Sequence, residues 1–194
     1  MSPALGADAF SARAVVLVEG LSDRHALEAL AERLGRNLEA EQVSIVPIGG
    51  ATNVGRFLEL FGPRGLDLRL AGLCDAGEEA EFQRRAEQAG LGSNLGRAEM
   101  ERLGFYVCEA DLEDELIRAL GAAAVERVID SQGELESFRT FQKQPAWRGR
   151  TTEQQLHRFF GTYTGRKIRS AALLVAALDL SRVPRPLGGV LAHV

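Results

Sequence analysis

The chain has 194 residues, of which 45% are hydrophobic and 26% charged, with 21 glycines and 6 prolines. This composition excludes a disordered tail and a collagen-like chain. A chain of this length buries about 70% of its surface on folding, so it does not need disulfides for stability. No apolar run approaches the roughly 20 residues that span a membrane, and residues 1–12 lack the pattern of a secretory signal. Cys74 and Cys108 lie in apolar runs without metal-binding spacing, which indicates reduced core thiols. We therefore expect a cytoplasmic protein.

Charge is unevenly distributed along the chain. The net charge is -4, yet residues 137–170 carry eight basic side chains against one acid, together with half of the twelve aromatic residues. One interpretation is a surface that holds a phosphate backbone beside an acidic site, through Arg148, Arg150, Arg166, Lys167 and Arg169. The other is an amphipathic helical segment with core aromatics and solvated arginines. Sequence alone leaves both open.

Apolar runs alternate with helical patterns over the first 120 residues. Strands are expected at 14–18, 43–48, 66–74 and 105–108, each bounded by glycine or a polar turn. Helical spacing predicts helices at 22–34, 54–61, 78–88, 97–103 and 112–120, the first capped by Ser22. Such alternation is typical of an α/β fold with a parallel four-stranded sheet and helices on both faces.

No strand pattern follows residue 120. Helices are expected at 122–131, 152–160 and 166–178, and Thr151 and Gln154 have the spacing of a capping box before the second of these. We therefore divide the chain into an α/β core, residues 13–120, and a C-terminal helical extension, residues 121–194, which carries the basic and aromatic segment.

Acidic residues follow three of the four expected strands. The carboxyl ends of parallel strands share one edge of a sheet, so these side chains should gather there and repel one another unless a cation compensates them. Oxygen ligands without His or Cys favour Mg²⁺ or Mn²⁺. The alternative is that the acids cap helices. The candidates are Glu19, Asp23, Asp75, Glu109, Asp111 and Glu113.

Several motifs resemble the TOPRIM fold, a Rossmann-like fold shared by topoisomerases, primases, recombination proteins and OLD-family (overcoming lysogenization defect) nucleases. The OLD branch is the most similar, and the resemblance runs from about residue 13 to the end. The resemblance rests on five motifs. They are residues 18–20 with 22–23, residues 46–50 with Asn53, residues 73–75, residues 111–116, and residues 165–167 with 183–184.

This resemblance implies metal-dependent DNA cleavage. It places Glu19, Asp23, Asp75, Asp111 and Glu113 at the family's metal-binding positions, and it matches Lys167 to a lysine that stabilises the transition state. Glu19 and Lys167 would then be the catalytic residues. A compact ammonium beside the scissile phosphate is suited to this role, provided that the extension folds back over the acidic edge.

Two features depart from the family pattern. TOPRIM proteins usually have Asp-x-Asp at the third strand, whereas Gly77 follows Asp75-Ala76 here. Glu78 or Glu79 could substitute, with Glu109 as a further candidate, and one or two ions would bind. OLD proteins typically join this domain to an ATPase, but this sequence has no phosphate-binding loop of the Gly-x-x-x-x-Gly-Lys-Ser/Thr type. Any ATPase would be a separate partner chain.

Three functions follow from these observations. The first is a Mg²⁺- or Mn²⁺-dependent endonuclease that acts on DNA. The second is a TOPRIM-like module that binds metal or nucleic acid without turnover and regulates a partner; Gly77 favours it, whereas Lys167 favours the first. The third is a nucleotidyl transferase of the primase kind.

Overall fold

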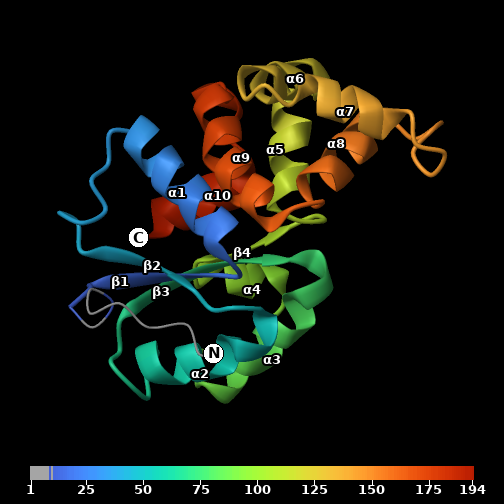
Figure 1. The fold of residues 1–194 in the computed structure, drawn as a ribbon. Coiled ribbons are helices and arrows are strands. Elements are labelled where there is room, and N and C mark those ends of the chain that lie inside the picture. The colour runs from blue at the N-terminus through green and yellow to red at the C-terminus, as the bar shows by residue number, and fades with distance from the viewer. Residues whose placement is uncertain (1–8, 10) are drawn as a thin grey trace.

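Four parallel strands form the centre of the fold (Figure 1). The computed structural model describes residues 9 and 11–194. The strand order is β2-β1-β3-β4, with bounds β1 (Ala14–Val18), β2 (Val43–Pro47), β3 (Arg69–Asp75) and β4 (Phe105–Cys108). The predicted α/β class and the parallel sheet are confirmed. Strand β3 begins later than expected, because the amides of Leu66 and Leu68 donate to helix carbonyls of Leu60 and Phe61 and close a turn.

The central strand β1 is buried along its whole length. Val16 and Val18 belong to the core on one face of the sheet, and Val15 and Leu17 to the core on the other. Successive strand residues point to opposite faces. A strand covered on both sides therefore reads as an unbroken apolar run.

Helices cover both faces of the sheet (Figure 1). One face packs against α2 (Val54–Phe61), α3 (Glu79–Gln88) and α4 (Arg97–Arg102), and the other against α1 (Leu21–Arg33), α9 (Thr164–Ala177) and α10 (Arg185–His193). Short 3₁₀ turns occur at η2 (Ala51–Asn53), η3 (Ala76–Glu78) and η4 (Leu180–Arg182). The expected cap of α1 was wrong: Gly20 is the N-cap, and Ser22 is buried inside the helix.

The chain after β4 is helical, as predicted, and comprises α5 (Leu112–Leu120), α6 (Ala122–Ser131), α7 (Leu135–Gln142), α8 (Thr152–Phe160), α9 and α10. The capping box of Thr151 and Gln154 is confirmed. Helices α7 and α10 were not anticipated. Helix α7 buries only Phe138 and Phe141, and α10 begins with Pro186 in its first turn and contains a glycine pair.

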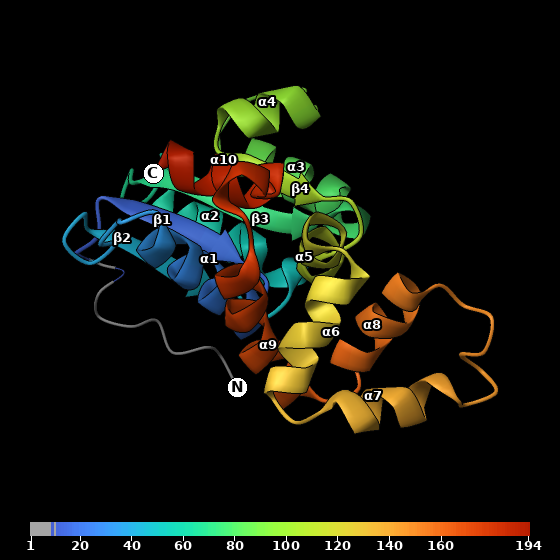
Figure 2. The same cartoon turned by 90° about the horizontal axis from the view of Figure 1, so that it is seen from above.

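These helices share one core with the sheet. Phe138, Phe160 and Leu174 are buried in the same cluster as Val16 and Leu27. Helix α9 lies alongside α1, as both views show, whereas α6, α7 and α8 extend beyond the sheet (Figure 2). Among the helices in the described part of the chain, none is long and apolar enough to cross a membrane.

Both cysteines are free and buried, as expected for core thiols. Cys74 lies in the core on one face of the sheet and Cys108 in the core on the other. Burial, and then the charge of Asp75, raises the pKa of Cys74 to about 12. The thiol of Cys74 therefore stays protonated at neutral pH.

Candidate metal centre

The acidic site lies where the strand order reverses. Strand β1 has β2 on one side and β3 on the other. The chain therefore leaves β1 and β3 in opposite directions, and a crevice opens at their carboxyl ends. Glu19 directly follows β1, and Asp75 is the last residue of β3. The topology thus brings together two acids that are far apart in the sequence.

The turn after β1 is held by backbone hydrogen bonds. The amide of Gly20 donates to Oδ2 of Asp23 (2.8 Å), and the amide of Gly49 donates to the Glu19 carbonyl (3.0 Å). Gly49 and Gly50 have φ values of 73° and 107°, which favour glycine. The side-chain amide of Asn53 donates hydrogen bonds to the backbone carbonyls of Ile48 and Gly49 (3.0 Å each) and so stabilises this loop. The glycine pair and Asn53 therefore position the backbone of Glu19.

Glu19, Asp75 and Glu78 form a group suited to a cation. Each offers a carboxylate oxygen, and these oxygens lie within 4.8 Å of one another. Oε2 of Glu78 is buried without a hydrogen-bond partner in the described structure, as are both oxygens of Glu113, so this Glu78 oxygen is available to a cation. A set of three carboxylates without His or Cys is the chemistry of Mg²⁺ or Mn²⁺. These residues therefore fit one divalent ion.

Electrostatics agrees with that assignment. Burial raises the pKa of Asp75 to about 7, and the charges of Glu19, Asp111 and Asp23 add to the effect. Burial and the charges of Glu19 and Asp23 also raise the pKa of Glu78. Like charges held close together are costly unless a cation compensates them.

A second acidic group lies beside the first and contains Asp23, Asp111 and Glu113. Glu113 is only 3% exposed, and Nζ of Lys167 lies 2.9 Å from its Oε2. Burial raises the pKa values of Asp23 and Glu113. Burial lowers the pKa of Lys167, but the charges of Glu113, Asp111 and Asp23 outweigh it and raise the pKa above its usual value. The ammonium therefore stays charged among the three acids.

His157 is a residue of this region that sequence reasoning missed. Its Nε2 lies 2.7 Å from Oδ2 of Asp111, while Oδ1 of Asp111 accepts from the Asp114 amide (2.9 Å) as the N-cap of α5. Burial acts to raise the pKa of Asp111, but these two hydrogen bonds and the charges of His157 and Lys167 together outweigh it and leave the pKa below its usual value. No motif links His157 to Asp111, because only the folding of α8 onto α5 brings them together.

One cavity collects five of the six residues predicted for metal binding and catalysis; Glu113 is not in its wall. It has a volume of about 380 Å³ and is lined by side chains from the ends of β1 and β3 and from α1, α5 and α9. The predicted site residues in its wall are Glu19, Asp23, Asp75, Asp111 and Lys167. The extension therefore does fold back over the acidic edge.

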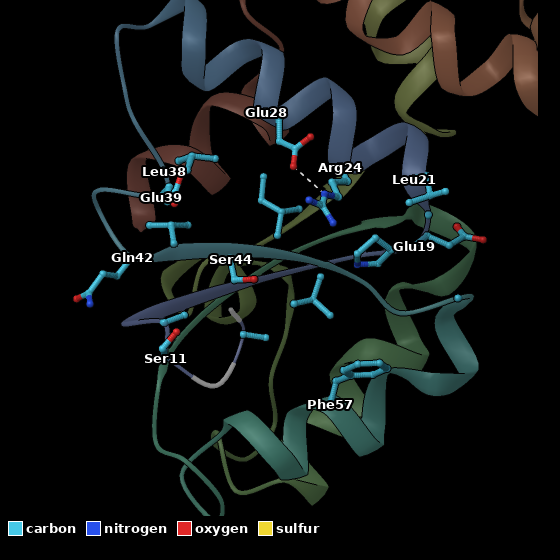
Figure 3. A pocket seen from close by; sticks show the side chains of 18 residues that line it. Ser11, Glu19, Leu21, Arg24, Glu28, Leu38, Glu39, Gln42, Ser44 and Phe57 are labelled. Atoms are coloured by element: carbon cyan, nitrogen blue, oxygen red, sulfur yellow. Dashed lines mark hydrogen bonds and ion pairs between the residues drawn. The ribbon is translucent and has the colours of Figure 1, made fainter. Parts of the chain in front are cut away.

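A larger cavity of about 850 Å³ lies along β2, the edge strand (Figure 3). Its labelled side chains include Gln42 and Ser44 near one end and Glu19 and Leu21 near the other, with the Arg24–Glu28 ion pair of 2.7 Å between α1 and the strand. It shares the wall around Glu19 with the smaller cavity. We place the chemistry in the smaller one, since the acids and the lysine meet there.

Two candidate ligands point elsewhere. Glu79 pairs with Arg97, whose Nε donates to Oε1 of Glu79 at 3.0 Å, and this hydrogen bond lowers the pKa of Glu79. The side chain of Glu109 is 73% exposed and lies 3.3 Å from Arg118. Of the substitutes considered for the missing Asp, only Glu78 therefore lies with Glu19 and Asp75.

The basic segment divides into two parts. Arg166 and Arg169 both pair with Glu134, and Arg166 also lies 3.9 Å from the ring centroid of Phe159. Arg148 and Arg150 are exposed on the loop between α7 and α8, which projects from the body (Figure 1). The aromatics of the segment are mostly core, as the second interpretation expected: Phe138, Phe141, Phe159 and Phe160 are buried, and Trp147 stacks on Phe141.

The four-stranded parallel sheet, with an acidic cluster at the switch point and helices on both faces, is the arrangement that the resemblance to TOPRIM domains implies. Residues 10–76 match the family model described as "Overcoming lysogenization defect protein-like, TOPRIM domain". Residues 10–76 therefore carry an OLD-like TOPRIM domain, which confirms the resemblance drawn from the motifs. TOPRIM domains are, as a family, metal-binding modules of enzymes that process nucleic acids.

Solved structures of OLD proteins share this fold. The C-terminal region of the Xanthomonas campestris pv. campestris OLD protein superposes with a TM-score of 0.76 at 24% identity, covering 96% of this chain and 94% of that one. The C-terminal region of the Burkholderia pseudomallei OLD protein gives 0.73 at 22% identity, covering 94% and 96%. The similarity therefore includes the helical extension. Comparison with curated proteins gives no match.

Proposed function

We propose that this chain is a divalent-metal-dependent DNA endonuclease that hydrolyses phosphodiester bonds and nicks its substrate. One observation carries the proposal: the carboxylate oxygens of Glu19, Asp75 and Glu78 converge within 4.8 Å, beside a cavity that the Lys167 ammonium also lines. Paired acidic and cationic groups at one crevice are what phosphodiester hydrolysis requires, because the reacting phosphate is an anion that gains charge in the transition state.

Each residue has a distinct part in this proposal. Glu19, Asp75 and Glu78 hold Mg²⁺ or Mn²⁺, which supplies Lewis acidity toward the phosphodiester and the attacking water. The side chain of Lys167 is 38% exposed, so its ammonium is accessible from the cavity and offsets charge on the phosphate oxygens. The Asp111 carboxylate accepts hydrogen bonds from His157 and from the Asp114 amide. It thereby holds α8 against the start of α5.

Affinity for DNA is assigned to the exposed basic loop. Arg148 and Arg150 are solvent-exposed and would contact phosphates without reading sequence. Arg166 and Arg169 would bind phosphate only by exchanging their partner Glu134. Replacing both loop arginines by Gln should weaken DNA binding. It should also make the slope of log K against log salt concentration shallower, by the amount that corresponds to about two phosphate contacts. We also propose that any ATP dependence comes from a separate ATPase partner.

The experiment that tests this function is nicking of supercoiled plasmid in the presence of Mn²⁺. We expect nicking by the wild type, and a loss of about a hundredfold or more for Glu19→Gln, Asp75→Asn and Lys167→Met, which each remove a group acting on the reacting phosphate or its cation. Glu109→Gln is the matched control, because it removes an exposed carboxylate that points away from the site.

A non-catalytic binding module is the second candidate, and Gly77 favours it. A Cβ at this position would meet no atom within 4 Å, so the carboxylate of the usual Asp-x-Asp pattern is missing where space exists for it. Binding of Mn²⁺ without nicking by the wild-type protein would support this module and contradict the nuclease.

A further inference from the structure

The two acidic groups of the centre differ in how their charges are compensated. In the first group, the oxygens of Glu19, Asp75 and Glu78 converge, and Oε2 of Glu78 has no hydrogen-bond partner in the described structure. In the second group, a hydrogen bond or an ion pair reaches each acid, although neither oxygen of the buried Glu113 has a hydrogen-bond partner among the described residues. The pairs are Gly20 amide to Asp23, Asp114 amide and His157 to Asp111, and Lys167 to Glu113.

The second group does not fit a divalent ion. Both oxygens of Asp111 are occupied, one by a helix amide and one by an imidazole, at 2.9 and 2.7 Å. Among the described residues, the only group of three or more potential ligands whose oxygens lie within 4.8 Å of one another is Glu19, Asp75 and Glu78. Coordination by Asp111 would require the cap of α5 to give up its hydrogen bond.

A cation is nevertheless present in the second group. The Lys167 ammonium lies 2.9 Å from the buried Glu113 carboxylate, and the charges of Asp111 and Asp23 also act on it. An ammonium is a compact point charge, and a dication placed among the same carboxylates would be repelled by it. The lysine and a second divalent ion therefore compete for one position.

We propose that the centre takes a single divalent cation, at Glu19, Asp75 and Glu78, and that the Lys167 ammonium is a built-in replacement for a second one at Asp23, Asp111 and Glu113. This inference rests on the metal centre of the proposed function. The absence of a carboxylate at Gly77 agrees with it, because a site that binds one dication fewer needs less negative charge.

The test is the number of Mn²⁺ ions bound per chain, measured by electron paramagnetic resonance of free Mn²⁺ during titration. The wild type should bind one ion. Lys167→Met keeps the aliphatic stem and removes the charge, so it should gain a second ion. Arg169→Met is the matched control, because it removes a positive charge from the same helix that is paired with Glu134. It should still bind one.

Two ions on the wild type, or one ion on a Lys167→Met protein whose circular dichroism shows native folding, would overturn the inference while leaving the nuclease proposal intact. A wild type that binds no Mn²⁺ would overturn both. Should Lys167→Met fail to fold, Glu113→Gln provides the test. If Glu113 pairs with Lys167 and does not bind metal, the variant should retain one ion with unchanged affinity. Loss of an ion would show that Glu113 is itself a ligand.

Discussion

Nε2 of His157 lies 2.7 Å from Oδ2 of Asp111, so a residue of α8 is joined to the cap of α5 at the edge of the acidic centre. This contact links the helical extension to the part of the chain that supplies the acids. It also gives the extension a measurable role in the site.

Replacing His157 by Ala should lower the free energy of unfolding by about 1 kcal/mol. This is less than a buried charged hydrogen bond contributes, because the His157 side chain is 42% exposed and solvent screens its pair with Asp111. The hydrogen bond that His157 donates to Asp111 raises the pKa of His157 above 6.5. The stabilisation by imidazolium is thus complete below 6.5 and lost as the pH rises through the raised pKa. Urea unfolding should therefore show a larger difference between wild type and variant at about pH 6 than at about pH 9. An equal difference at both pH values would contradict this account; His157→Gln, which keeps a donor, should be intermediate.

Binding of Mn²⁺ should weaken as the pH falls below 7. Burial and neighbouring acids raise the pKa of Asp75 to about 7, so below that pH a proton must leave before the carboxylate can coordinate. We expect the affinity to fall about tenfold per pH unit below 7 and to level off above it. Isothermal titration calorimetry across this range measures the effect. Asp75→Asn should bind weakly with a flatter pH profile, whereas a wild-type affinity that is the same on both sides of pH 7 would refute the assignment.

Gly77→Asp should tighten Mn²⁺ binding. A side chain at this position would meet no atom within 4 Å, and the new carboxylate would lie next to Glu78 in the turn after β3. The added charge should also lower the thermal stability of the metal-free protein, because it joins acids that already repel one another. Gly77→Ala is the control, since it changes the backbone preference without adding a ligand, and its affinity should stay at the wild-type value. An Asp variant no tighter than the Ala variant would show that this position does not face the cation.

Leu174→Ala should destabilise the whole chain in one step. Leu174 is fully buried in α9, in the cluster that also contains sheet residues, and truncating a buried leucine costs about 2–5 kcal/mol. Thermal denaturation should retain a single transition at lower temperature, because the extension and the sheet share one core. Two separate transitions would contradict this. Leu180→Ala, at a residue 40% exposed, is the matched control and should change stability little.

Local patterns predicted most of the elements, because their causes are local. The five apolar residues of β1 and the capping box of Thr151 and Gln154 each specify their structure within a few positions. Helices α7 and α10 lack such signals. Helix α10 depends on contacts with distant strands, since a Cβ at Gly189 would come within 2.3 Å of the Tyr106 ring on β4. That close approach explains a glycine that would otherwise argue against a helix.

The sequence by itself determined the alternation of strands and helices and placed Glu19 and Asp75 at strand ends. The reason is that the spacing of apolar residues and the residue types at turns depend only on neighbouring positions. Only the tertiary structure decided between Glu78 and Glu79, since that choice depends on whether a side chain meets Arg97 or the carboxylates of other strands. It likewise decided that Lys167 meets Glu113 and that His157 meets Asp111. Contacts between residues so far apart arise from packing of the whole chain, and no local pattern records them.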